Sequence, residues 1–399
     1  MDAVHQILAF NAGRDPEALR IKYRTMRGGA FAFLRGTAPL FYERLRRRGV
    51  FRSAPLVWSC GDLHLENFGS YKADNRLVYF DINDFDDAAL APASWDLVRM
   101  LASVWVAADR IAVTAGEARR LCRAFLDAYA ASLAAGKAYW MERETAQGLV
   151  RELLDGLRNR DRPRFIAGRT RIVGKRRVLR VDGKKALAAS AAQRAAVLDF
   201  MSKFAPTRPD PRFFTVLDVA RRVAGVGSLG LDRYAVLVRG KGSPDGNYLL
   251  DLKQSMPSAL APRLQVAQPQ WQTEAHRVVA IQRRLQAVSI AFLHAVDVAG
   301  EAFVLRGLQP SEDRVTLDRS IQKAAELQQV VATMGRLVAW AQLRSSGREG
   351  SATTDELIDF GQRRKWKDKL LAASQDCAAQ VRADSAAFDA AYDDGAFDV

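Results

Sequence analysis

The hydrophobic and polar positions change their period twice along the chain, which predicts helices, then strands, then helices. Apolar positions recur at helical spacing over about the first 50 residues and again from about Ala93 to Leu157. From Phe214 to about Gln309, short β-branched and aromatic runs predict strands, interrupted by a helix near Trp271–Val288. Helical spacing returns from about Asp318 onward. The whole pattern predicts an α+β fold.

Two breaks in composition give the expected domain organisation. An Arg- and Gly-rich stretch at residues 158–185 follows the second helical region, and a helix near Ala186–Phe204 then leads into the proline-rich run APTRPDPRF. We therefore expect a helical lobe over residues 1–205, a β-rich lobe over residues 206–310 and a helical tail over residues 311–399 that packs on the first lobe.

Composition is that of a globular protein. Hydrophobic residues make up 49% of the 399 residues and charged residues 26%, which allows a core of ordinary size. The N-terminus lacks a basic segment followed by an apolar one, and no run approaches the roughly 18 apolar residues of a membrane helix. The three cysteines are far apart, which argues against a disulfide framework or a zinc site. We expect a cytoplasmic protein without a membrane span.

The net charge of +15 is concentrated in one segment. Between Arg158 and Lys185, 12 Lys and Arg face 2 acids. Two interpretations stay open: a solvated basic face, or attraction for an anionic partner such as a phosphorylated substrate, nucleic acid or a membrane surface. Phe165 is the only aromatic residue there, so base stacking has little support and nucleic acid is not the expected partner.

The residues best suited to chemistry lie in the runs GDLHLENFG and DINDFDD, between residues 60 and 87. Short strand patterns flank the first run and precede the second. Divalent cations such as Mg²⁺ prefer carboxylate and amide oxygens, and phosphoryl transfer needs a group that orients the attacking hydroxyl. We therefore predict Asp62 as catalytic base and Asn67 and Asp84 as metal ligands, with Asp86 or Asp87 assisting.

Two further side chains of this region have open roles. Clustered acids repel one another unless a cation lies among them, which supports the metal prediction. His64 is a catalytic candidate that either orders the loop through a hydrogen bond or takes a direct part in the chemistry. Asp81 is either a further ligand or a hydrogen-bonding residue at the end of a strand.

A glycine motif follows much later in the chain. The run G-V-G-S-L-G has the form G-x-G-x-x-G and lies between two predicted strands, whereas a dinucleotide-binding loop opens a helix. A strand–loop–strand of this kind is what a kinase uses to cover phosphates. The nucleotide-binding candidates in this run are Gly225, Gly227, Ser228 and Gly230.

The next predicted strand ends in Lys253, in the position of a phosphate-binding lysine. The helix that follows contains Glu274 and Gln282. Glu274 is the better candidate to pair with Lys253, and Gln282 is the alternative.

These motifs carry a resemblance to known proteins. G-D-L-H-x-x-N followed by I-N-D-F-D-D resembles the catalytic and metal-binding loops of aminoglycoside phosphotransferases and related kinase-like enzymes. PASWDL resembles their D-P-x-x-D-L segment, with one extra residue and no leading Asp, and the resemblance implies that Asp96 steadies the catalytic loop. The runs RTMRGGAFAFLRG, CGDLHLENFGSY, FDINDFDDA, SWDLVRMLAS and AGVGSLGLDRY are similar to the bacterial domain-of-unknown-function family 2252, over roughly Arg24 to Pro310.

The order of the motifs decides the expected fold. The lobe with the glycine loop precedes the catalytic loop in ordinary kinases and follows it here, so we predict a circularly permuted, two-lobe kinase-like fold whose helical tail returns to the catalytic lobe. The predicted function is an ATP- and Mg²⁺-dependent phosphotransferase acting on an unknown hydroxyl acceptor. A nucleotidyl (AMP) transferase and a non-catalytic nucleotide-sensing pseudokinase stay open as alternatives.

Overall fold

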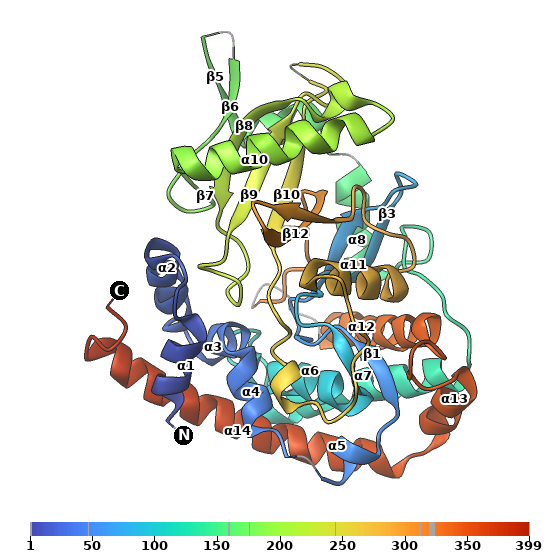
Figure 1. Cartoon of the computed structure of the whole chain (residues 1–399). Coiled ribbons are helices and arrows are strands. Elements are labelled where there is room, and N and C mark those ends of the chain that lie inside the picture. Colours follow the sequence, from blue (N-terminus) through green and yellow to red (C-terminus); the bar gives the residue numbers. More distant parts are fainter. Residues whose placement is uncertain are drawn as a thin grey trace.

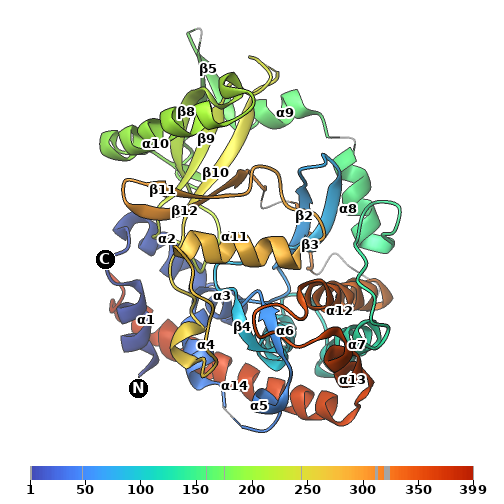
Figure 2. The ribbon, with the colours of Figure 1, turned by 45° about the vertical axis from the view of Figure 1, so that its right-hand side comes forward.

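The computed structural model describes residues 2–46, 48–158, 160–174, 176–243, 245–310, 313–318 and 324–398. A curled sheet occupies one end of the molecule and a group of helices the other (Figure 1). Helix α11 (Glu274–Leu285) lies between the two parts, as Figures 1 and 2 both show. The predicted α+β class is confirmed.

The sheet is antiparallel throughout. Its six strands run in the order β11 (His294–Val298), β12 (Glu301–Gly307), β10 (Tyr248–Gln254), β9 (Arg233–Val238), β8 (Val216–Arg222) and β7 (Ala186–Leu187). The sequence predicted all of these strands except β7. The helix expected near Ala186–Phe204 is wrong at its start, because α10 (Ala191–Phe204) begins only after Ser190, whose side chain accepts the Gln193 N–H in a capping box.

Both faces of the sheet are buried, which explains why β9 is apolar at nearly every position. Tyr234, Val236 and Val238 pack against α10, while Ala235 and Leu237 pack on the other face near α9 (Arg162–Ala167). Alternate residues of one strand therefore serve two cores. Strand β7 and helix α10, which precede residue 205, pack with the sheet, and the domain boundary at that residue stays a prediction.

The helical part is built around a helix with no exposed face. Every residue of α6 (Ala93–Ala107) is buried, because α7 (Ala115–Ala134), α14 (Lys365–Asp393) and neighbouring strands cover it. The helix α12 (Ala324–Ser345) packs along α7. The other helices are α1 (Ala3–Asn11), α2 (Pro16–Met26), α3 (Ala30–Gly36), α4 (Ala38–Arg44), α5 (Val50–Ser53), α8 (Gly148–Arg158) and α13 (Thr354–Gln362).

Three small two-stranded sheets complete the fold. Strand β1 (Leu56–Ser59) pairs with β4 (Ala89–Pro92), and β2 (Phe68–Lys72) pairs with β3 (Val78–Ile82). The third is β5 (Thr170–Val173) with β6 (Arg176–Leu179), a hairpin that projects at the top of Figure 1. The two termini lie on the same side of the molecule, where α1 contacts α14. Within the described ranges, no helix is long and apolar enough to cross a membrane.

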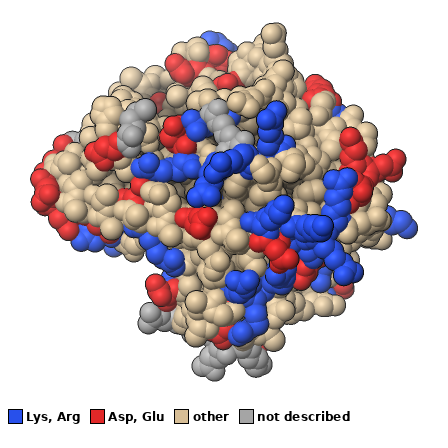
Figure 3. All heavy atoms as spheres, turned by 90° about the horizontal axis from the view of Figure 1, so that it is seen from below, with Lys and Arg blue, Asp and Glu red and all other residues tan. Residues whose placement is uncertain are grey.

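Positive charge is not confined to the segment from Arg158 to Lys185. Part of the charge there is already used: Arg160 pairs with Asp313, and the Arg169 guanidinium lies 3.9 Å from the centre of the Phe165 ring. Seen from the opposite end, Lys and Arg also gather on one side of the surface, with Asp and Glu among them (Figure 3). An anionic partner for the segment stays a prediction.

Candidate active site

The β2–β3 hairpin brings Asn67 and Asp84 together. The Asn83 N–H donates to the Asn67 carbonyl at 3.0 Å, at the open end of the hairpin. The Asn67 side-chain Nδ2 donates to the backbone carbonyls of Asp62, at 3.1 Å, and Asp84, at 3.4 Å. Since the amide nitrogen makes both bonds, Oδ1 is the atom of Asn67 that is suited to a cation.

Helix α6 fixes the loop that carries Asp62. The Asp96 carboxylate accepts the backbone N–H groups of Cys60, at 2.9 Å, and Gly61, at 3.1 Å. Three residues further along the same helix, Arg99 Nε donates to Asp62 Oδ1 at 2.6 Å. Positions three apart share a helix face, so one face of α6 holds both the backbone and the side chain of this loop. Asp96 therefore makes the steadying contacts that the resemblance implies.

Burial raises the pKa of Asp62 to about 7, and the nearby Asp87 and Asp84 carboxylates raise it too. These effects together outweigh the Arg99 guanidinium, which lowers the pKa. The Asp62 side chain nevertheless keeps 21% of its surface exposed, so a ligand can reach it. A carboxylate with a pKa near neutrality is suited to accept a proton at physiological pH.

His64 orders the loop. Its Nδ1 accepts the Glu66 N–H at 3.1 Å, and its Nε2 lies 4.0 Å from Asp62 Oδ2. Burial, with the guanidinium groups of Arg35 and Arg99, lowers the His64 pKa well below its usual value. The histidine is therefore neutral. The loop-ordering hydrogen bond is formed, while a catalytic part for His64 stays a prediction.

Lys253 lies against the acids of the second motif. Its ammonium is 3.6 Å from Asp84 Oδ1 and forms a closer ion pair with Asp86. Burial opposes ionisation of Asp84, but Lys253 and nearby arginines lower its pKa to about 2. Burial and the neighbouring Asp84 raise the pKa of Asp86. The lysine thus places one positive charge between the two carboxylates that were predicted to hold a metal.

The expected pair between Lys253 and Glu274 is not formed, which corrects the sequence prediction. Glu274 instead accepts from Arg277 Nε at 2.5 Å. Arg277 is buried, where it donates to backbone carbonyls of Asp86 and Ala88, so its charge needs a carboxylate nearby. Glu274 supplies that charge and lies outside the centre.

The alternative partner, Gln282, is buried and donates to Gln286 at 3.1 Å. Gln286 in turn donates to the Ile82 carbonyl at 2.9 Å. Asp81 accepts the Ile82 N–H and pairs with Arg344 at 3.3 Å, so it is a hydrogen-bonding residue at the end of β3. Gln282, acting through Gln286, and Asp81 therefore both support the β2–β3 hairpin.

The donor set fits a hard cation that is shared with a phosphate. Within the described part of the chain, no three His, Cys, Asp or Glu side chains converge on one metal position. Mg²⁺, however, is commonly held by one or two carboxylates, with phosphate oxygens and water as its other ligands. The side chains of Asp84 and Asp86 are 44% and 34% exposed, so both are accessible. The Mg²⁺ site stays a prediction that these oxygen donors suit.

The glycine loop connects β8 and β9, as predicted, and closes one side of the same cavity, whose volume is about 480 Å³. The N-terminal helices hold this loop in place: Arg14 and Lys22 both donate to the Gly227 carbonyl, at 2.9 and 3.1 Å. The predicted residues that line the cavity are Asp62, His64, Asn67, Asp84, Asp86, Gly225, Gly227, Ser228 and Gly230.

Arg14, Lys22 and Arg99 were not among the residues predicted for this site. For Arg99 a signal exists, since a cation inside an otherwise apolar helix is buried only when it is paired. For the other two, no local pattern gives their contact with a loop more than 200 residues away.

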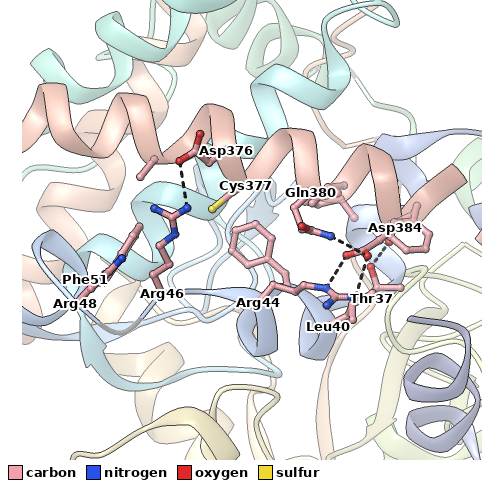
Figure 4. A pocket seen from close by; sticks show the side chains of 15 residues that line it. Thr37, Leu40, Arg44, Arg46, Arg48, Phe51, Asp376, Cys377, Gln380 and Asp384 are labelled. Atoms are coloured by element: carbon pink, nitrogen blue, oxygen red, sulfur yellow. Dashed lines mark hydrogen bonds and ion pairs between the residues drawn. The ribbon is translucent and has the colours of Figure 1, made fainter. Parts of the chain in front are cut away.

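A further cavity, of about 270 Å³, lies between α4, α5 and α14 and shares no lining residue with the centre (Figure 4). Its two carboxylates pair with arginines, Asp384 with Arg44 and Asp376 with Arg46, and Arg48 adds a further positive charge. It lacks the grouped Asp and Asn oxygen donors of the first cavity.

Comparison with protein families supports the longer of the two resemblances. A family model described as "Uncharacterized protein conserved in bacteria (DUF2252)" matches residues 14–391, which include every residue of the centre. No curated protein and no solved structure matches the chain. The chain therefore belongs to the bacterial family DUF2252.

Proposed function

We propose that this protein is an ATP- and Mg²⁺-dependent, kinase-like phosphotransferase that acts on a hydroxyl group. The observation that carries the proposal is one cavity in which Asp62, with a pKa near 7, lies beside the oxygen donors of Asn67 and Asp84. A site that only binds anions has no need of a carboxylate that can change its protonation state near neutral pH.

Each residue has a role that follows from its contacts. Asp62 accepts the proton of the acceptor hydroxyl, while Arg99 and Asp96 fix its position. Asn67 and Asp84 hold Mg²⁺ with help from Asp86. When bound, Mg²⁺–ATP supplies the phosphoryl group and the metal charge. Because phosphoryl transfer depends mainly on positioning and electrostatic stabilisation, the bound Mg²⁺ and the fixed side chains around it would supply most of the rate enhancement.

The order of elements supports a circularly permuted kinase-like fold. The strands, glycine loop, Lys253 and α11 follow the catalytic hairpin in the chain, and α12 then returns to pack on α7. The termini lie on one side of the molecule, which is the arrangement that permutation requires. In this interpretation, Lys253 exchanges its carboxylate partners for phosphate oxygens when nucleotide and metal bind.

A non-catalytic nucleotide sensor is the second candidate, and one observation favours it. Lys253 pairs with Asp84 and Asp86 rather than with Glu274, so the lysine–glutamate pair of an active kinase is not formed. Stabilisation by Mg²⁺–ATP without formation of ADP or pyrophosphate supports the sensor; formation of either product removes it.

The test is an Asp62→Asn variant assayed for Mg²⁺-dependent ADP formation, with water and small hydroxyl compounds as acceptors. We expect turnover to fall about 100-fold or more, because a general base contributes on that order, while ATP still raises the melting temperature. The control is Asp127→Asn, since Asp127 is half-exposed on α7 and pairs with Lys367. Full turnover in Asp62→Asn would remove Asp62 from the reaction and overturn the proposal.

A further inference from the structure

A second cavity, of about 330 Å³, adjoins the centre and shares with it Arg35, Glu66, Asp84, Gly225, Val226 and Arg314. It lies between residues 224–226 of the glycine loop and the residues 309, 310 and 314–317, which follow β12. Six arginines from six different segments line it: Arg35, Arg110, Arg222, Arg233, Arg306 and Arg314.

Three of these guanidinium groups, those of Arg35, Arg110 and Arg314, share one carboxylate at the cavity wall. Glu66 pairs with Arg35 at 2.6 Å, with Arg110 at 2.5 Å and with Arg314 at 3.6 Å. One negative charge therefore faces three positive ones. These three arginines come from α3, from the residues after α6 and from the segment 313–318, so the fold brings them together from distant parts of the chain.

The other three surround a carboxylate inside the sheet. Asp251 is fully buried and pairs with Arg222 at 2.9 Å, Arg233 at 2.7 Å and Arg306 at 3.4 Å. Among the described residues, Glu66 and Asp84 are the acids that line the cavity, and Asp84 also pairs with Lys253. In the described part of the chain, six guanidinium groups thus face the three carboxylates of Glu66, Asp84 and Asp251, which leaves a surplus of about three positive charges.

The surplus of positive charge is unfavourable because the guanidinium groups repel one another, and a bound anion would reduce this repulsion. Burial, together with the neighbouring Arg35 and Arg233, lowers the pKa of Arg314. The buried Nε of Arg35 has no hydrogen-bond partner among the described residues. Guanidinium groups match phosphate oxygens with two parallel hydrogen bonds. A single phosphate carries at most about two negative charges, fewer than the surplus.

We propose that this arginine-lined cavity binds a chain of phosphate groups beside Asp84. The identity of that chain rests on the proposed function, and two sources share this chemistry. One is the triphosphate of the nucleotide, bound with its outer phosphates in the cavity. The other is a multiply phosphorylated acceptor.

The two sources give different products. In the first, which is nucleotidyl rather than phosphoryl transfer, the acceptor oxygen bonds to the α-phosphorus, the α–β anhydride bond breaks, pyrophosphate leaves and Asp62 takes the hydroxyl proton. In the second, the acceptor oxygen bonds to the γ-phosphorus, the β–γ anhydride bond breaks, ADP leaves and Asp62 takes the hydroxyl proton.

The cavity is tested without nucleotide, by calorimetric titration of the full-length protein with inorganic tripolyphosphate. Arg314→Gln and Arg110→Gln are the informative variants, because these side chains are 30% and 47% exposed and their loss leaves the core intact. Each removes charged hydrogen bonds to phosphate, so we expect about tenfold weaker binding. The matched control is Arg123→Gln, since Arg123 is 37% exposed on α7 and pairs with Asp368. Equal affinity in all four proteins would overturn the proposal.

Competition identifies the source. If saturating Mg²⁺–ATP displaces tripolyphosphate and Arg314→Gln weakens ATP binding, the chain belongs to the nucleotide; if both bind together, it belongs to the acceptor. Both results support the cavity. The Asp62→Asn variant separates the two claims, because it should lose transfer and keep tripolyphosphate binding. Absence of turnover in the unmodified protein counts against the proposed function, and arginine-independent tripolyphosphate binding counts against the cavity.

Discussion

Replacing Asp96 with alanine tests how the candidate catalytic loop is held. The two carboxylate oxygens of Asp96 accept the N–H groups of Cys60 and Gly61, and all three residues are buried. Each buried N–H that loses its partner costs about 1–3 kcal/mol, so the two together cost about 2–6 kcal/mol. Burial raises the pKa of Asp96, which means that its removal also recovers part of a desolvation cost. We therefore expect a loss of about 2–4 kcal/mol in the free energy of unfolding, within the range for a broken buried network.

The measurement is urea unfolding followed by tryptophan fluorescence and circular dichroism. Asp96→Asn keeps one acceptor oxygen and turns an amide N–H₂ toward the other donor, so it should lose about half as much. Asp127→Ala is the control, because an exposed ion pair contributes about 0–1 kcal/mol. If Asp96→Ala is as stable as this control, Asp96 does not hold the loop and the account of Asp62 positioning fails.

Three other outcomes can be checked directly. Lys253→Met should destabilise the metal-free protein by about 1–2 kcal/mol, which is less than the loss of a fully buried ion pair because Asp84 and Asp86 are partly exposed. Mg²⁺ should raise the melting temperature of this variant. If the variant without metal melts at the same temperature as the unmodified protein, the ion pairs are contradicted. Gly61→Ala should cost at least about 2 kcal/mol, because Gly61 has φ +88° and a Cβ there meets the Asp87 backbone, whereas Gly156→Ala in open space on α8 should gain about 0.5–1 kcal/mol; similar effects at both positions refute this reasoning. The kcat/KM for phosphoryl transfer should rise with pH up to about 7 and then level off, because the raised pKa of Asp62 keeps the base protonated below that value; a flat profile between pH 5 and 8 excludes Asp62 as the titrating base.

Local patterns were sufficient for most elements of the fold. The runs of β-branched and aromatic residues gave five strands of the sheet, β8 to β12. Strand β7 escaped prediction because it has two residues and exists only by pairing with β8. Strands this short carry too little pattern of their own, and the neighbouring strand decides them.

The candidate site divides in the same way. The spacing of Asp62, Asn67 and Asp84 within one hairpin is local, so sequence alone brought them to one place. The partner of Lys253 is not local, because it depends on how α11 packs and on the buried Arg277 that takes Glu274 for itself.

The sequence by itself determined most of the secondary structure, the hairpin that carries the candidate site and the family, because each depends on residues that are close in the chain. Only the tertiary structure decided which charges meet. Arginines from six segments line the cavity beside Asp84, and no spacing in the sequence relates them. The physical reason is that electrostatic energy depends on distance and burial in space, which chain separation does not fix.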